Sequence, residues 1–263
     1  MLASFTVSTA RPVRSGVVRH SSGLIVVNNH GIPKHVIAAA VQAGKTFWAL
    51  PESLKADLDI HKSPNFKGYT ALLGENTDPN GKGDLHEGFD IGWEELGGGN
   101  RQDSSSRDDG AMTGSNVWPE LPGFRETVLA YYHAAIQLGR SLFPLFALAL
   151  NLPENFFDDK TTKPAAIMRL LHYPPQSPTK VDVDGEVIGI GAHTESTLHR
   201  VINKSGKERH SIPVFFGTNY DVPLEPIPSC ISEDSPPKYE VVTAGEYVKS
   251  RLEATYAHSS LTD

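Results

Sequence analysis

The sequence predicts an α+β fold, with long helices in its first 150 residues and paired strands after residue 164. Apolar residues recur at three- and four-residue spacing from Val36 to Leu50 and from Phe124 to Leu150, which is the spacing of one helix face. From Ala165 onward, short apolar runs alternate with turn residues, as in strands joined by hairpins. With 39% apolar residues, the chain can bury a globular core.

The first elements are predicted to be scaffold. The apolar run Leu24–Asn28 is typical of a buried strand, and Asn29-His30-Gly31 turns the chain into a helix with Pro33 in its first turn. A second short helix is expected to start at Pro51. His30 is expected to make a structural hydrogen bond in the turn rather than to bind a metal.

Two extended segments are predicted next, around Lys67-Gly68-Tyr69 and from Leu85 to Trp93. Tyr69, Glu87 and Phe89 are either substrate contacts or ordinary packing residues, and packing is the favoured alternative. Residues 97–116 are rich in Gly, Ser and Asp and are predicted to form a surface loop.

The longest helix is predicted from Phe124 to about Leu150. Pro144 has no N–H to donate to the preceding turn, so a kink or a break is expected near residue 140. This helix would provide a surface on which a sheet can pack.

Strands and a terminal helix are predicted in the last hundred residues. Residues 165–173 form one strand, and Asp184-Gly185 favours a hairpin over residues 181–188 because these residues accept positive φ angles. Residues 198–203 and 208–216 are predicted to pair as a second hairpin. Thr243-Ala244-Gly245-Glu246 is a capping box that opens a helix through Tyr256.

His193, Glu195 and His199 form the densest group of metal-ligating residues. Two histidines and one carboxylate on one face of an ion are the ligands with which non-haem Fe(II) oxygenases leave positions open for oxygen and substrate. Alternate strand residues point to one side, so His193 and Glu195 can share an ion. Arg209 and Ser211 share a face for the same reason, and the arginine fork can hold a carboxylate.

At these residues the chain resembles the Fe(II)- and 2-oxoglutarate-dependent dioxygenases, in the branch that includes isopenicillin N synthase and plant hormone and flavonoid oxygenases. That family carries His-x-Asp, a distal His followed by Arg-Val, and then Arg-x-Ser. The similar residues here are His193-Thr194-Glu195, His199-Arg200-Val201 and Arg209-His210-Ser211. The likeness continues in Asn29–Pro33, in His86–Gly92 and in His172-Tyr173-Pro174-Pro175.

The resemblance implies a double-stranded β-helix (jelly roll) core packed on N-terminal helices. It implies Fe(II) held by His193, Glu195 and His199 as the catalytic and metal-binding residues. It also implies 2-oxoglutarate as cosubstrate, with its far carboxylate on Arg209 and Ser211 and with Tyr173 offering its hydroxyl. Leu171 stands where family members often have Asn. The implied reaction hydroxylates, desaturates or cyclises a small molecule with O2, although isopenicillin N synthase-like members use Arg-x-Ser on the substrate instead.

The chain departs from the family between the first and second histidine. Family members have several tens of residues there, which form middle strands of the jelly roll, whereas only Ser196–Leu198 separate Glu195 from His199 here. The expected core is therefore truncated by an internal deletion, and Glu replaces the usual Asp. A continuous strand would place His199 roughly 20 Å from His193, at about 3.3 Å per residue, so iron binding requires a turn between them.

Three regions are predicted in this chain. Residues 1–122 form an N-terminal non-haem dioxygenase-type region, residues 123–163 a connecting long helix, and residues 164–263 the truncated oxygenase core with its terminal helix.

Two alternatives from other functional classes remain open. One is a catalytically inactive remnant that acts at most as a binding or interaction protein, with self-association through strand edges that the missing strands leave exposed. The other is a module that binds a small acid through Arg209 without iron chemistry.

Charge and composition exclude several partners. The net charge is −7 and no cluster of Lys and Arg interrupts it, so neither nucleic acid nor an anionic membrane is an expected partner. The longest apolar run, Leu142–Leu150, is too short to cross a bilayer. The single Cys230 suits a reducing compartment, so a cytoplasmic location is expected.

Overall fold

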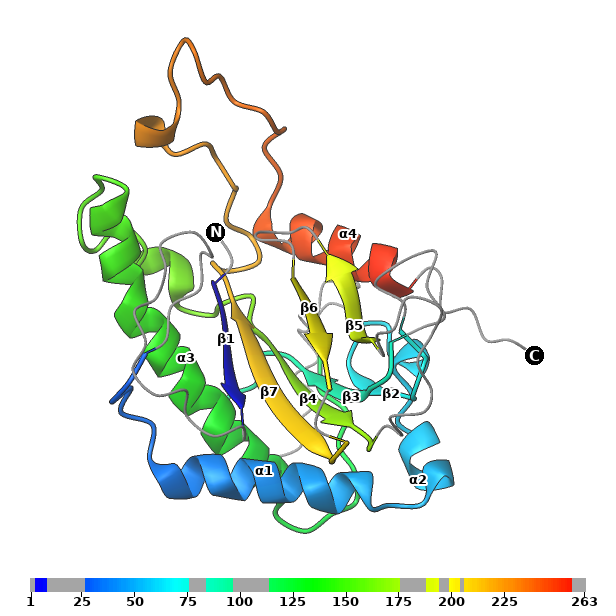
Figure 1. The fold of residues 1–263 in the computed structure, drawn as a ribbon. Coiled ribbons are helices and arrows are strands. Elements are labelled where there is room, and N and C mark those ends of the chain that lie inside the picture. Colours follow the sequence, from blue (N-terminus) through cyan, green and yellow to red (C-terminus); the bar gives the residue numbers. More distant parts are fainter. Residues whose placement is uncertain are drawn as a thin grey trace.

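The computed structural model describes residues 3–8, 27–75, 84–96, 114–175, 188–193, 199–203 and 206–256. Within these residues, a five-stranded antiparallel sheet lies between helices, and two further strands form a separate pair (Figure 1). The strands are β1 (Ala3–Ser8), β2 (Gly68–Thr70), β3 (Glu87–Ile91), β4 (Ile167–Tyr173), β5 (Ile188–His193), β6 (His199–Ile202) and β7 (Arg209–Phe216). The α-helices are α1 (Lys34–Trp48), α2 (Glu52–Ala56), α3 (Phe124–Ala149) and α4 (Ala244–Tyr256), with short 3₁₀ helices at Ile60–Lys62, Asp159–Thr161 and Pro228–Cys230.

The large sheet has the strand order β1-β7-β4-β3-β2. β7 lies between β1 and β4, and β4 in turn lies between β7 and β3. The sheet therefore joins strands from the first, middle and last parts of the chain. Its two faces carry different residues, because successive side chains of a strand point to opposite sides.

One face packs on α1 and α3 and holds the main hydrophobic core. Met168 and Leu170 of β4 and Val214 of β7 contribute to it and are almost fully buried. The helix α3 approaches β7 closely at Gly139, where an added Cβ atom would lie 2.9 Å from Cγ of Phe216. A glycine at this position allows the close approach.

The opposite face is covered in part by α4. Val248 of this helix packs with Ile167 of β4, and Leu252 and Phe215 lie beside them. The predicted capping box is confirmed at the start of α4. The Glu246 N–H donates to Oγ1 of Thr243 at 3.1 Å, and the Thr243 N–H donates to the Glu246 carboxylate at 2.7 Å.

The turn before α1 has the predicted form. Asn29 and Gly31 both have positive φ, at 56° and 81°, and α1 follows directly after Pro33. Nδ1 of His30 accepts a hydrogen bond from the Ile32 N–H at 3.1 Å. The expected structural role of His30 is thereby confirmed.

Pro144 does not split the long helix, because α3 is continuous from Phe124 to Ala149; of the two expected outcomes, a kink or a break, the break is excluded. Phe143 and Ala147 are buried on either side of Pro144 and pack both halves on one core. The expected pairing of the last two strands was wrong. The strands at 198–203 and 208–216 exist but do not pair, because β1 and β4 occupy both edges of β7 and β6 pairs with β5.

Some predicted features lie outside the described residues. These are residues 24–26 of the first predicted strand, 97–113 of the predicted loop and 181–187 of the Asp-Gly hairpin. No helix in the described part of the chain is long and apolar enough to cross a bilayer.

Candidate active site

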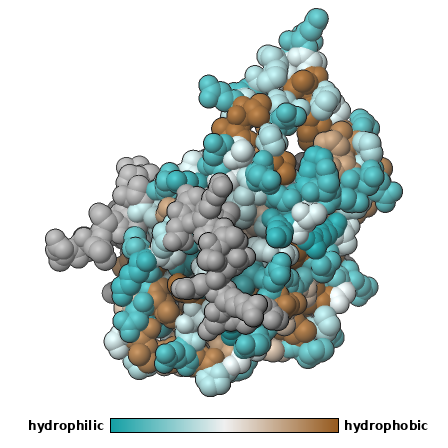
Figure 2. All heavy atoms as spheres, turned by 180° about the vertical axis from the view of Figure 1, so that it is seen from behind, coloured by the Kyte–Doolittle hydropathy of each residue, from teal (hydrophilic) through white to brown (hydrophobic). Residues whose placement is uncertain are grey.

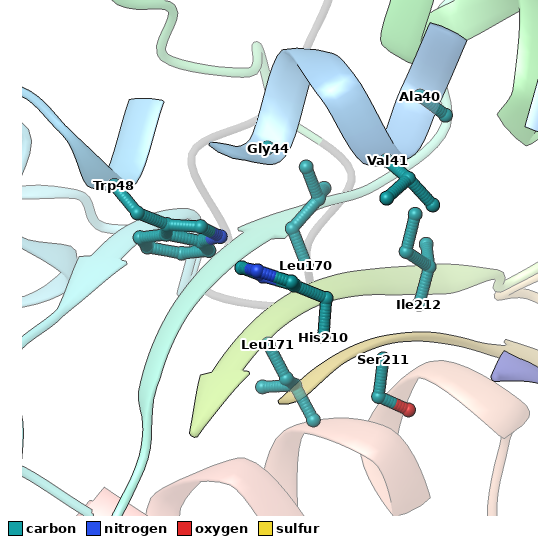
Figure 3. Close-up of a pocket in the computed structure, with 9 residues that line it drawn as sticks. All are labelled: Ala40, Val41, Gly44, Trp48, Leu170, Leu171, His210, Ser211 and Ile212. Carbon is teal, nitrogen blue, oxygen red and sulfur yellow. The ribbon is translucent and has the colours of Figure 1, made fainter. Parts of the chain in front are cut away.

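The three predicted cosubstrate residues come together at one end of the β4–β7 pair. Tyr173 of β4 lies opposite Arg209 of β7, and Ser211 lies opposite Leu171. By alternation these four residues share the sheet face on the side of α4. Figure 3 shows Leu171 and Ser211 pointing toward that side, whereas the ring of His210 points to the α1 side.

The guanidinium of Arg209 lies over the ring of Tyr173, with 5.0 Å between its carbon and the ring centroid. Tyr173 and Ser211 are both buried. Burial raises the pKa of Tyr173 to about 12, although the charges of Arg209 and Arg169 oppose this. The phenol therefore stays protonated at neutral pH and can donate a hydrogen bond beside a cation and a hydroxyl. This donor set suits a carboxylate.

A buried ionic network lies next to Tyr173 on the same face. The Arg169 guanidinium donates to the Asp90 carboxylate at 2.9 Å and to both oxygens of Glu75 at 2.9 and 2.7 Å. His86 adds a contact of 3.0 Å from Nε2 to Glu75, and its ring centroid lies 5.6 Å from that of Tyr173. Burial disfavours the ionised form of Glu75, but Arg169 and His86 outweigh this and hold its pKa below the usual range. The network thus fixes the surroundings of the Tyr173 ring.

The sequence analysis did not identify this network. Arg169 lies two residues before Leu171 and therefore shares its strand face. This alternation could have indicated that Arg169 lies on the same side of the sheet as the predicted cosubstrate residues. Glu75 lies 94 residues away from Arg169 in the chain, and no local pattern connects the two.

The backbone brings two predicted iron ligands together. β5 pairs with β6 in antiparallel orientation, and His193 lies directly opposite His199. Opposite Cα atoms in such a pair are about 4.5–5.5 Å apart, not the roughly 20 Å of a continuous strand. The chain thus folds back between the two histidines as iron binding requires. Glu195, between them, lies outside the described residues.

A second His–Glu–His group lies elsewhere. His172, Glu208 and His210 have ligand atoms within 4.8 Å of one another. In the β4–β7 register, His172 is opposite His210. These residues alternate with Tyr173 and Arg209, so they belong to the face that packs on α1 and α3. This group is therefore separate from the predicted cosubstrate residues.

The three candidate substrate contacts have different surroundings. Phe89 is fully buried in the main core, where it packs against Phe47 with 4.8 Å between ring centroids. Tyr69 and Glu87 line a cavity of about 300 Å³, together with Lys55 and Pro174. The packing alternative is thus confirmed for Phe89, while Tyr69 and Glu87 also border a cavity.

The chain is similar to known proteins over most of its length. A family model described as the N-terminal region of non-haem dioxygenases in morphine synthesis matches residues 18–121. The 2-oxoglutarate-Fe(II) type oxidoreductase hxnY of Emericella nidulans is 30% identical over 295 residues, covering 90% of this chain and 82% of the relative. The chain belongs to the 2-oxoglutarate- and Fe(II)-dependent oxidoreductase family.

Other known proteins are similar to this chain over most of their length. Kihadalactone A synthase LFS of Citrus sinensis is 26% identical over 297 residues, covering 88% of this chain and 84% of the relative. A full-length Neurospora crassa protein, crystallised in complex with alpha-KG and 5-formyluracil, has a TM-score of 0.68 at 21% identity, and the match covers 85% of this chain and 83% of that one. This likeness shows a shared fold, the jelly-roll fold of these oxygenases.

Proposed function

We propose that this chain oxidises a small organic molecule with O2, with His193, Glu195 and His199 holding iron and with Tyr173, Arg209 and Ser211 holding the far carboxylate of 2-oxoglutarate. Fe(II) and 2-oxoglutarate are the cofactor and cosubstrate of its family. The observation that carries the proposal is the meeting of Tyr173, Arg209 and Ser211 on one sheet face.

The residues fit the proposed ligands in kind and in register. Neutral imidazole and a hard carboxylate suit Fe(II), and the register sets His193 opposite His199. When bound, the iron supplies the oxygen chemistry, and the protein supplies binding and orientation. The glutamate between the two histidines is one methylene longer than the family's aspartate, which gives its carboxylate extra reach.

The chain's own residues would orient the cosubstrate and keep it from water. Arg209 neutralises a carboxylate, and Ser211 and the protonated Tyr173 donate hydrogen bonds to it. Tyr173 and Ser211 are buried, so water has little access to this end of the site. A low local dielectric strengthens each of these contacts.

An internal deletion in the jelly roll remains part of the proposal. The alignments with the relatives from Emericella nidulans and Citrus sinensis extend over 295 and 297 residues, whereas this chain has 263. Both relatives therefore contain residues that this chain lacks. We place the missing strands between Glu195 and His199, where the family spacing is shortened.

The finer assignments are also proposals. The family model ends at residue 121, which supports an N-terminal region over 1–122, followed by a connecting helix over 123–163 and the core over 164–263. Membership of the isopenicillin N synthase-like branch rests on the motifs described above. A cytoplasmic location rests on the single cysteine, and the absence of nucleic acid and membrane partners rests on the net charge of −7.

Calorimetry separates the proposed enzyme from its rivals. The full chain is titrated with Mn(II) as an oxygen-stable substitute for Fe(II), and then with 2-oxoglutarate. Two coupled binding events support the oxygenase, acid binding alone supports an acid-binding module, and no binding supports an inactive remnant. Succinate formation with Fe(II) and O2 then tests turnover directly.

The Arg209→Ala variant tests the proposed cosubstrate contact. Removal of a charge-assisted pair costs about 1.5–3 kcal/mol, so 2-oxoglutarate should bind at least tenfold more weakly while Mn(II) binds as before. Arg251→Ala, which removes an exposed arginine of α4, serves as the matched control. Unchanged 2-oxoglutarate affinity in the Arg209 variant would contradict the assignment.

A further inference from the structure

The face of the sheet that packs on α1 and α3 carries a group of three side chains that could bind a metal ion. His172 of β4 and His210 of β7 are directly opposite in the register, and Glu208 precedes β7 by one residue. The two imidazole rings are stacked, with centroids 5.0 Å apart and planes 13° apart. Figure 3 shows the His210 ring on the side of α1, pointing toward Trp48 and away from Ser211.

The Glu208 carboxylate contacts the Nε2 atoms of both rings. Its Oε1 is 3.0 Å from Nε2 of His172, and its Oε2 is 3.7 Å from Nε2 of His210. Both histidines are buried, whereas the glutamate side chain is 55% exposed. The group therefore combines two fixed nitrogen ligands with one carboxylate that can adjust and that solvent can reach.

The other ring nitrogen of His172 has its own carboxylate partner. Nδ1 lies 2.7 Å from Oε1 of Glu87, and Glu87 is held in turn by Lys55 at 2.7 Å and by the Tyr69 hydroxyl at 2.8 Å. Metal-binding histidines usually donate their second ring N–H to such a carboxylate, which fixes the tautomer and the ring orientation. His172 is thus oriented with Nε2 available toward Glu208.

The proton count at His172 points to a cation. A neutral imidazole has only one N–H, and an ionised carboxylate can only accept hydrogen bonds. Both nitrogens of His172 nevertheless face carboxylate oxygens, at 2.7 and 3.0 Å. A cation between Nε2 and Glu208 would bind both the second ring nitrogen and the carboxylate.

We propose that His172, Glu208 and His210 form a binding site for a zinc-like divalent cation, separate from the predicted cosubstrate residues on the opposite face and from the predicted iron ligands of β5 and β6. Zinc takes two imidazoles and a carboxylate readily, and water can complete its four ligands at the exposed side. Ligand atoms in a tetrahedral zinc site are about 3.4 Å apart, so the present spread of up to 4.8 Å requires the group to close by roughly 1.4 Å around the ion. The bound ion would link β4 to β7 beside Arg209.

Zinc titration of the full chain, competed by a chromophoric chelator, tests the site. The measurement uses a His193→Ala and His199→Ala background, so that the predicted iron ligands do not contribute. One equivalent of Zn²⁺ should remain bound in this background. Glu208→Gln or His210→Gln should weaken that binding at least tenfold, and Glu87→Gln should weaken it about tenfold through the orientation of His172.

Glu253→Gln, which alters an exposed carboxylate of α4, is the matched control and should bind Zn²⁺ unchanged. If the background variant does not fold, the same comparison is made on the native chain, where Glu208→Gln should lose one equivalent. Loss of all zinc binding when His193 and His199 are replaced, or unchanged binding in Glu208→Gln, would overturn the proposal and leave His172 as a hydrogen-bond partner of Glu87 and Glu208 only. Because 2-oxoglutarate binding is tested through Arg209, the two proposals can fail separately.

Discussion

Glu87 shows how one buried carboxylate can depend on several partners. It lies on β3 and accepts hydrogen bonds from Lys55, Tyr69 and His172, all within 2.8 Å. Burial disfavours its ionised form, but the hydrogen bonds from these three side chains prevail and lower its pKa to about 2. The carboxylate therefore stays ionised in the folded chain far into the acid range.

This lowered pKa predicts a loss of stability in acid. The unfolded chain takes up the proton near pH 4.5 and the folded chain only near pH 2, so the contribution of Glu87 is complete above pH 4.5 and is lost as the pH falls toward 2. Glu87→Gln should lower the free energy of unfolding by about 1.5–3 kcal/mol at pH 7 and flatten its decline between pH 4.5 and 2. Urea unfolding at several pH values measures both effects. An equal decline in the variant and the native chain would contradict the assignment, and Glu253→Gln is the control.

At the residue scale, the sequence predicted which residues share a sheet face with Arg209. Arg209 and Ser211 are two apart on one strand, and Tyr173 lies on a strand predicted with nearly its true bounds. Period-two alternation was enough to assign their faces. The His172 group was not predicted, because Glu87 and Glu208 reach His172 through strand pairings that no local pattern encodes.

The helix α3 offers a test at the scale of a single element. Gly139→Ala would place a Cβ atom 2.9 Å from Phe216, which is itself packed against Phe143 at 4.9 Å between centroids. Overpacking costs about 1–3 kcal/mol, and the better helix propensity of alanine returns about 1 kcal/mol. The variant should therefore be less stable by up to about 2 kcal/mol in thermal or urea unfolding.

Gly44→Ala in α1 is the matched control for this substitution. Its Cβ would meet Leu170 at 3.4 Å, an ordinary contact beside a small cavity of about 10 Å³. Here the gain in helix propensity should dominate and raise stability by up to about 1 kcal/mol. If both variants were stabilised equally, the result would contradict the close approach of α3 to β7 at Gly139.

Helices and caps were more predictable than strand partners. α1, α3 and α4 follow from apolar spacing, prolines and a capping box, all of which are local signals. The hairpin predicted for 198–203 and 208–216 was wrong because such predictions assume that consecutive strands pair. β1, which was not among the predicted strands, pairs with β7 along six residues.

At the scale of the whole molecule, the proposed deletion predicts that activity depends on the lost strands. Insertion of the corresponding segment of hxnY between Glu195 and His199 should restore the family spacing and raise succinate formation at least tenfold, since misplaced catalytic groups cost large factors in rate. A Gly/Ser linker of equal length is the control. Equal rates for the two insertions would show that the strands themselves contribute nothing.

The segment between β7 and α4 carries exposed apolar side chains. Residues 223–243 project from the body of the fold in Figure 1, and Figure 2 shows hydrophobic atoms among hydrophilic ones on the projecting part. Tyr239 is 86% exposed, and Val241 is 55% exposed. Self-association, expected from strand edges, therefore has a second apolar surface available, and Tyr239→Ser with Val241→Ser should reduce it in light-scattering measurements.

The stacking of Trp48 on His172, with 5.8 Å between ring centroids and 21° between planes, gives the protein a natural fluorescent reporter. A charged imidazolium quenches indole emission more strongly than a neutral ring does. With Trp93 and Trp118 replaced by phenylalanine, Trp48 would remain as the single tryptophan, and its emission would report on the neighbouring His172 ring without any added dye.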